Sequence, residues 1–240
     1  MSAGRLQLGN KAPNFKAHTT KEEIDFYTYV GENWVILFCY PDDFAPVATT
    51  ELVMLAQLQE EFSKRKVKLL TMSTKNNPNQ SGDYTSHEEW AKDVGEISGA
   101  PLTCPIIVDS DGKVSKLYNI LDEGDVHDLN KNDDVSEGAG FKRRTVLIIG
   151  PDKKIWLNLN YPYEVGFNTA EILRTVDCLQ TTTRTKTLTP ANWVPGSDVL
   201  VDPKLSDEDA KAKHGDLTVL RPYVRFTKLP VEETSVRNIE

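Results

Sequence analysis

The sequence predicts an α/β protein, a three-layer sandwich around a mixed sheet, followed by a small irregular C-terminal domain. Over residues 1–183, short apolar runs of the length of buried strands alternate with segments of helical periodicity. Two of these runs are separated by the turn sequence Gly-Pro-Asp-Lys at residues 150–153, which predicts an antiparallel hairpin. Over residues 184–240 prolines recur with little hydrophobic periodicity, which indicates a separate domain.

The first clear strand and helix of the sequence are neighbours in the chain. Residues 33–40 (NWVILFCY) are apolar, aromatic and β-branched, which is typical of a buried strand. From Thr49 onward, apolar residues return every three or four positions, as in a helix that packs one face on a core. These residues are Leu52, Leu55, Leu58 and Phe62. The basic residues 64–66 suit the carbonyl end of that helix, and residues 67–73 predict the next strand.

The middle of the chain predicts a second helix and a short strand. Residues 86–97 have helical periodicity, with Ser86 as the expected N-cap and Glu89 three positions further on. Residues 105–108 are apolar and short enough for a buried strand. Residues 113–121 predict one or two helical turns.

Two polar segments and three regular elements complete the first domain. Residues 75–84 and 122–140 are rich in turn-forming residues, so we expect surface loops there. Residues 144–149 and 154–160 are the two strands of the hairpin. Residues 168–180 predict a helix, because their apolar side chains share one face.

Charge and hydropathy exclude several classes of protein. Acidic residues outnumber basic ones, 36 to 28, which gives a formal net charge of -8. That balance argues against nucleic acid and against an anionic membrane surface as partners. No apolar run is long enough to cross a bilayer, and residues 1–11 lack the apolar stretch of a signal peptide. We therefore expect a cytoplasmic protein.

Cysteines and histidines give no sign of a disulfide framework or a metal site. The three cysteines, Cys39, Cys104 and Cys178, are odd in number and widely spaced, without a CxxC pair. We expect each to be a small buried residue. The four histidines are scattered without metal-ligand spacing, so we expect solvated or helix-capping roles for them. The sequence thus predicts neither a metal nor another cofactor.

Residues 41–51 (PDDFAPVATTE) join the first strand to the helix that follows. The first turn of a helix presents unpaired N–H groups and a positive dipole end, so a thiol placed there is more acidic. The segment resembles the active-site loop of the peroxiredoxins, in which Pro-x-x-x-Thr-x-x-Cys precedes Thr-Thr-Glu. Pro41 and Glu51 match this motif, whereas its threonine falls on Ala45 and its peroxide-attacking (peroxidatic) cysteine falls on Ala48.

The resemblance extends over nearly the whole chain. Arg144 matches the arginine that stabilises the thiolate in the family. Several later stretches resemble the one-cysteine subfamily: Tyr161-Pro162, EILR at residues 171–174, TPANW at residues 189–193 and YVRFTK at residues 223–228. The resemblance implies a thioredoxin-like domain over residues 1–183. It also implies a C-terminal dimerisation domain over residues 184–240, and hence a homodimer.

Parts of the family's chemistry are missing from this sequence. An alanine side chain has neither a lone pair nor a titratable proton, so Ala48 cannot attack a peroxide. Without a hydroxyl group, Ala45 cannot orient one either. The family's Ser-His before the motif proline is replaced by Cys39-Tyr40, and a second family arginine by Phe167.

The remaining groups near the motif have simple structural explanations. Cys39 is the nearest thiol, but it lies at a strand end and not in the first turn of the helix, so we do not expect it to replace the nucleophile. Arg144 could bind a small anion, but we favour an ion pair with Glu51, because buried arginines usually have a partner.

Two functional hypotheses follow from the resemblance. In the first, the chain is a natural peroxiredoxin-like protein that has lost catalysis and has a binding or structural role, for example as a subunit of a larger assembly. In the second, it is an active one-cysteine peroxiredoxin, a hydroperoxide reductase, in which Ala48 is an engineered replacement of the catalytic cysteine. The additional departures at Tyr40, Ala45 and Phe167 favour natural loss.

Overall fold

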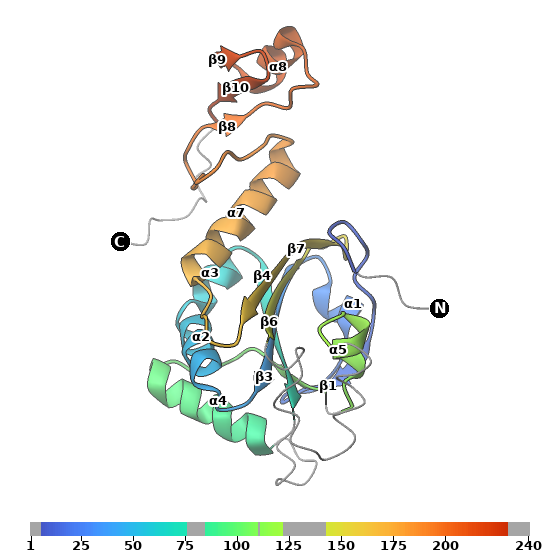
Figure 1. The fold of residues 1–240 in the computed structure, drawn as a ribbon. Helices are drawn as coiled ribbons and strands as arrows, with labels where there is room; N and C mark the ends of the chain where they lie inside the picture. The colour runs from blue at the N-terminus through green and yellow to red at the C-terminus, as the bar shows by residue number, and fades with distance from the viewer. Residues whose placement is uncertain (1–5, 76–84, 110, 122–142, 230–240) are drawn as a thin grey trace. The chain divides into compact units, whose positions relative to one another are not determined.

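The computed structural model describes residues 6–75, 85–109, 111–121 and 143–229 (Figure 1). The chain divides into two compact units, residues 1–169 and residues 170–240. The predicted loop at residues 122–140, and nearly all of the one at residues 75–84, lie outside the described residues.

The first unit is built on a five-stranded mixed sheet with the strand order β5-β4-β3-β6-β7. The strands are β3 (Trp34–Asp42), β4 (Val67–Lys75), β5 (Ile106–Val108), β6 (Arg143–Ile149) and β7 (Ile155–Pro162). Strands β3, β4 and β5 pair in parallel, whereas β6 pairs antiparallel with both β3 and β7. The predicted mixed sheet and its hairpin are therefore confirmed.

Helices cover both faces of this sheet and make the expected three layers (Figure 1). One face carries α2 (Pro46–Gln57), α3 (Gln59–Lys64) and α4 (Thr85–Ser98), and the other carries α1 (Phe26–Val30) and α5 (Lys113–Leu117). Strand β3 is buried over almost its whole length because it lies between these two layers. Its residues alternate between the faces, so Leu37 and Cys39 pack in the core with α1 while Phe38 and Tyr40 point toward α2.

The helix after β3 differs from the prediction at both ends. It begins at Pro46 instead of Thr49, because proline fits the first helical turn, where its missing N–H would have no partner anyway. The predicted continuous helix is interrupted at Leu58, so α2 and α3 are separate elements.

The expected capping role of Ser86 is wrong. Helix α4 begins one residue earlier, at Thr85, which places Ser86 inside the first turn. The Ser86 hydroxyl donates instead to Asp43 Oδ2, at 2.7 Å. A tertiary contact has therefore replaced the local cap that the spacing suggested.

The elements that precede β3 were not predicted from the sequence. Strands β1 (Lys16–His18) and β2 (Glu23–Asp25) form a two-stranded antiparallel sheet that leads into α1. Each strand has only three residues, too few for a periodic signal. Phe15 and Phe26, whose rings stack at 4.8 Å, pack this region into the core.

The second unit contains more regular structure than expected. It comprises α7 (Thr169–Thr185), α8 (Asp207–His214) and a three-stranded sheet of β8 (Val199–Leu200), β9 (Thr218–Arg221) and β10 (Val224–Thr227). The predicted domain boundary at residues 183/184 falls inside α7, whereas the structure divides at the start of this helix. The reason is that Cys178 on α7 packs with Trp193 and Val199.

The turn between β6 and β7 leaves little room for a side chain at position 150. A Cβ atom on Gly150 would lie 2.6 Å from Trp156 Nε1 and 2.8 Å from Asp152 Oδ1. We expect Gly150→Ala to lower the free energy of unfolding by about 1–3 kcal/mol, the usual cost of overpacking. Gly95→Ala is the matched control, because its Cβ would have no neighbour closer than 3.7 Å in a helix, where alanine stabilises by about 0.5–1 kcal/mol. Urea unfolding of both variants measures the difference, and equal midpoints would contradict the packing argument.

Candidate functional site

The candidate site lies where β3 ends and α2 begins. Ala45 precedes the first turn of α2 and has no side-chain oxygen to cap it. The first main-chain bond of the helix runs from Thr49 N–H to Ala45 O, at 2.8 Å. The helix itself therefore leaves the N–H groups of Val47 and Ala48 without a partner. The Ala48 side chain is 1% exposed and points into the protein.

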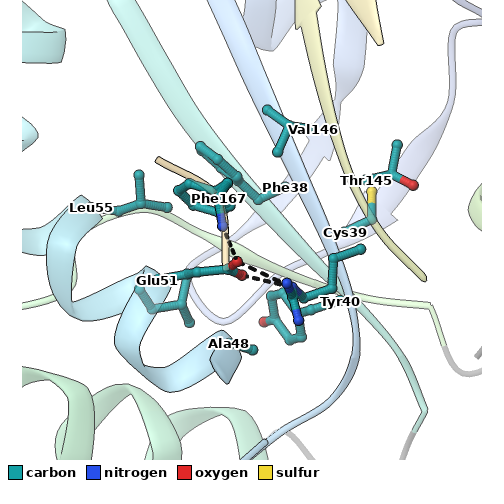
Figure 2. Close-up of a pocket in the computed structure, with 11 residues that line it drawn as sticks. Phe38, Cys39, Tyr40, Ala48, Glu51, Leu55, Thr145, Val146 and Phe167 are labelled. Atoms are coloured by element: carbon teal, nitrogen blue, oxygen red, sulfur yellow. Dashed lines mark hydrogen bonds and ion pairs between the residues drawn. The ribbon is translucent and has the colours of Figure 1, made fainter. Parts of the chain in front are cut away.

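Ala48 borders a small pocket between α2, β3 and β6 (Figure 2). The lining residues are Phe38, Cys39, Tyr40, Ala48, Glu51, Leu52, Leu55, Arg144, Thr145, Val146 and Phe167. The pocket is small. The volume open to the centre of a water molecule is about 10 Å³, so the pocket has room for about one water. The structure thus brings together three of the predicted site residues, Ala48, Glu51 and Arg144.

The other two predicted site residues lie outside the lining. Ala45 is buried at the start of α2, and Pro41 is buried near the end of β3. Neither residue borders the pocket. Their expected roles stay predictions.

Glu51 and Arg144 form the buried ion pair that the sequence favoured. Arg144 Nε lies 3.1 Å from Glu51 Oε1 and 3.0 Å from Oε2, and the arginine is only 2% exposed. The guanidinium also donates to the main-chain carbonyls of Tyr163 and Val165. Glu51 Oε1 accepts a further bond from Phe167 N–H at 3.0 Å. Burial raises the pKa of the Glu51 carboxyl group, and the bonds from Phe167 and Arg144 offset part of this effect.

Two aromatic side chains narrow the pocket from different sides. Tyr40 packs edge-on against Trp90, with ring centres 4.9 Å apart, and burial raises the pKa of its hydroxyl. That hydroxyl is buried near Thr71 but makes no hydrogen bond of normal geometry with any residue that the structure describes. Phe167 stacks on Phe38 at 5.2 Å. Figure 2 shows the two phenylalanines above Glu51 and Tyr40 below it, beside Ala48.

The cysteines behave as the small buried residues that were expected. All three are free and buried, and burial raises the pKa of each thiol, to about 12 for Cys104. Cys39 borders the pocket, but its side chain belongs to the core on the opposite face of the sheet. Its thiol therefore points away from Ala48. Burial is the main cause of the raised pKa of this thiol, and the nearby Asp109 carboxylate raises the pKa further.

A buried polar cluster near the site was not predicted from the sequence. Asp43 Oδ2 lies 2.7 Å from Ser86 Oγ and 2.6 Å from His87 Nδ1, and His87 is only 2% exposed. The expectation of a solvated or capping histidine is therefore wrong for His87. Next to the cluster, Trp90 Nε1 donates to Thr49 Oγ1 at 3.0 Å. The bond from Ser86 to Asp43 joins the start of α4 to the loop before α2 across 43 residues of sequence, a separation that no local pattern reveals.

The described part of the chain contains neither a metal-binding cluster nor a membrane-spanning helix. Among the residues that the structure describes, no group of three or more potential metal-binding side chains comes together. Within the same residues, no helix is long and apolar enough to cross a membrane.

Comparison with known proteins places these features in a family. Residues 8–157 match the family model of the AhpC/TSA family, and residues 178–222 match the model of the C-terminal domain of 1-Cys peroxiredoxin. Similar proteins include Peroxiredoxin PRX1, mitochondrial, from Saccharomyces cerevisiae, 42% identical over 93% of this chain and 81% of the relative. Peroxiredoxin-6 from Gallus gallus is 40% identical over 94% of this chain and 98% of the relative.

A solved structure agrees with this comparison. The chain resembles the structure of yeast mitochondrial 1-Cys peroxiredoxin with a TM-score of 0.83 and 40% identity, covering 93% of this chain and all of that one. The likeness bears out the expected thioredoxin-like fold with a small C-terminal domain. Because the yeast relative is named as mitochondrial, the cytoplasmic location expected from the sequence stays a prediction.

Proposed function

The chain belongs to the 1-Cys peroxiredoxins, thiol peroxidases of the AhpC/TSA family, and from this premise we propose that it is a natural member that no longer reduces peroxides. One observation carries the proposal. The side chain at the buried first turn of α2, in the pocket beside Glu51 and Arg144, is the methyl group of Ala48. The family motif puts its peroxidatic cysteine at this position.

The chemistry of the family defines what is lost. A thiolate sulfur attacks one oxygen of the peroxide, the O–O bond breaks, and the other oxygen leaves as an alcohol or water after it takes up a proton. The sulfur is oxidised to a sulfenic acid, which a second thiol later reduces. A methyl group at Ala48 has no electron pair to begin this sequence.

The groups that surround Ala48 support the proposal because they are unsuited to replace the nucleophile. Cys39 points to the other face of the sheet, and burial raises the pKa of its thiol. The Arg144 guanidinium donates to Glu51 and to two main-chain carbonyls, which accounts for its burial without any ligand. Ala45 offers no hydroxyl to a peroxide.

A retained fold without its nucleophile points to a binding or structural role. Formation of a homodimer, and membership of a larger assembly, stay predictions from the resemblance. The alternative, an active peroxidase in which Ala48 is an engineered replacement, requires a cysteine codon at this position of the native gene. The departures at Tyr40, Ala45 and Phe167 weigh against it, since blocking the reaction needs only one replacement.

A peroxide-consumption assay on the unaltered chain tests the proposal. With hydrogen peroxide and dithiothreitol as the reducing thiol, we expect the same rate with and without the protein. An intact 1-Cys peroxiredoxin assayed in parallel shows that the conditions support turnover. Turnover by the unaltered chain that disappears after treatment with iodoacetamide would prove a reactive thiol elsewhere and overturn the proposal.

A further inference from the structure

The segment from Tyr163 to Phe167 is tied across the pocket. Its carbonyl groups at Tyr163 and Val165 accept hydrogen bonds from Arg144, and the N–H group of Phe167 donates to Glu51. These bonds hold the main chain of this segment to the buried ion pair at both its start and its end.

The same segment runs close to the first turn of α2. A Cβ atom on Gly166 would lie 3.6 Å from Val47 Cγ1 and 3.8 Å from Glu51 Oε1, so the main chain passes within ordinary contact distance of the helix. With its main chain fixed, the Phe167 ring has little freedom to leave its stack on Phe38.

Tyr40 closes the pocket from the side of Ala48. It is 3% exposed and is held by the edge-on contact with Trp90. Trp90 is itself fixed by its bond to Thr49 on α2. Between Tyr40 and Phe167 the pocket keeps room for about one water molecule.

We propose that Tyr40 and Phe167 form an aromatic plug that limits the pocket beside Ala48 to solutes of one or two heavy atoms. Both residues line the pocket with a six-membered aromatic ring, at positions where the motif resemblance implies a histidine and an arginine. Hydrogen peroxide is within this limit, whereas a hydroperoxide with a branched or aromatic substituent exceeds it. The inference rests on the proposed function, because it takes position 48 as the place of the peroxidatic cysteine beside this pocket.

A thiol at position 48 serves as the probe of access. In an Ala48→Cys background, sulfenic acid formation is followed by dimedone labelling and mass spectrometry with hydrogen peroxide and with cumene hydroperoxide. We expect the smaller peroxide to react faster by about a hundredfold, within the range for steric exclusion from an apolar pocket. Adding Phe167→Ala or Tyr40→Ala should reduce this ratio by about tenfold or more, mainly by raising the rate with cumene hydroperoxide.

Two further variants keep the test decisive. Tyr161→Leu is the control, because Tyr161 lies 6.3 Å from the Phe167 ring but does not line the pocket, so the ratio should stay unchanged. Phe167→Leu replaces the alanine variant if the latter fails to fold, and should lower the ratio to a smaller extent. If the thiol reacts but the ratio of its rates with the two peroxides does not depend on residues 40 and 167, the aromatic plug alone is overturned. A thiol that reacts with neither peroxide in any variant would overturn the plug and the assignment of position 48, whereas the proposed function is overturned only by peroxide turnover of the unaltered chain.

Discussion

Ala48→Cys is expected to give the chain a peroxidase activity that it otherwise lacks. The new thiol would stand in the first turn of α2, at the positive end of the helix dipole and beside N–H groups that the helix leaves unpaired. That environment lowers the pKa of a thiol and raises the thiolate fraction at neutral pH. Hydrogen peroxide consumption with dithiothreitol should therefore become measurable, and dimedone labelling should locate the sulfenic acid at residue 48.

The missing hydroxyl at position 45 should limit this regained activity. Ala45→Thr added to Ala48→Cys is expected to raise the rate by roughly ten- to a hundredfold, the worth of one hydrogen bond to a charged centre. Val47→Cys is the matched control, because its thiol would enter the same helical turn outside the pocket lining. Equal activity of the Val47 and Ala48 variants would show that the position in the pocket does not matter and would contradict the site.

The parts of the fold that could be predicted are those with a strong local signal. Strand β3 is marked by its apolar run, and the hairpin of β6 and β7 by its turn at residues 150–153. Both elements form as predicted because a few adjacent residues determine each of them. In β3 these are apolar side chains on both faces, and in the hairpin they are the residues of the tight turn. The three-residue strands β1 and β2 have no such signal, and their pairing depends on contacts made by the finished core.

The candidate site was predictable only where a motif marked it. Pro41, Ala45, Ala48 and Glu51 belong to one short segment, so the resemblance located all of them together. The cluster of Asp43 with Ser86 and His87 joins segments that carry no shared motif, and the burial of His87 follows from tertiary packing alone. The sequence around His87 therefore predicted a solvated or capping side chain, which was wrong.

Arg144→Met is expected to destabilise the protein more than any other substitution considered for this site. The variant would leave the Glu51 carboxylate buried without its cation, and the carbonyls of Tyr163 and Val165 without their donor. Removing one partner of a buried ion pair costs about 3–5 kcal/mol of unfolding free energy. Urea unfolding followed by circular dichroism measures this loss against the unaltered chain.

The neighbouring arginine on the same strand provides the control. Arg143 is half-buried and donates one bond to the Ile120 carbonyl at 2.9 Å, so Arg143→Met should cost only about 1 kcal/mol. Combining Arg144→Met with Glu51→Leu should cost less than the sum of the two single changes, because the double variant leaves no unpaired buried charge. A loss below about 0.5 kcal/mol for Arg144→Met, the size of an ordinary surface change, would contradict a structural role for the pair. Arg144 would then be available to bind another ligand. A large loss that Glu51→Leu partly relieves would instead identify Arg144 as the residue that holds the segment from Tyr163 to Phe167 in place.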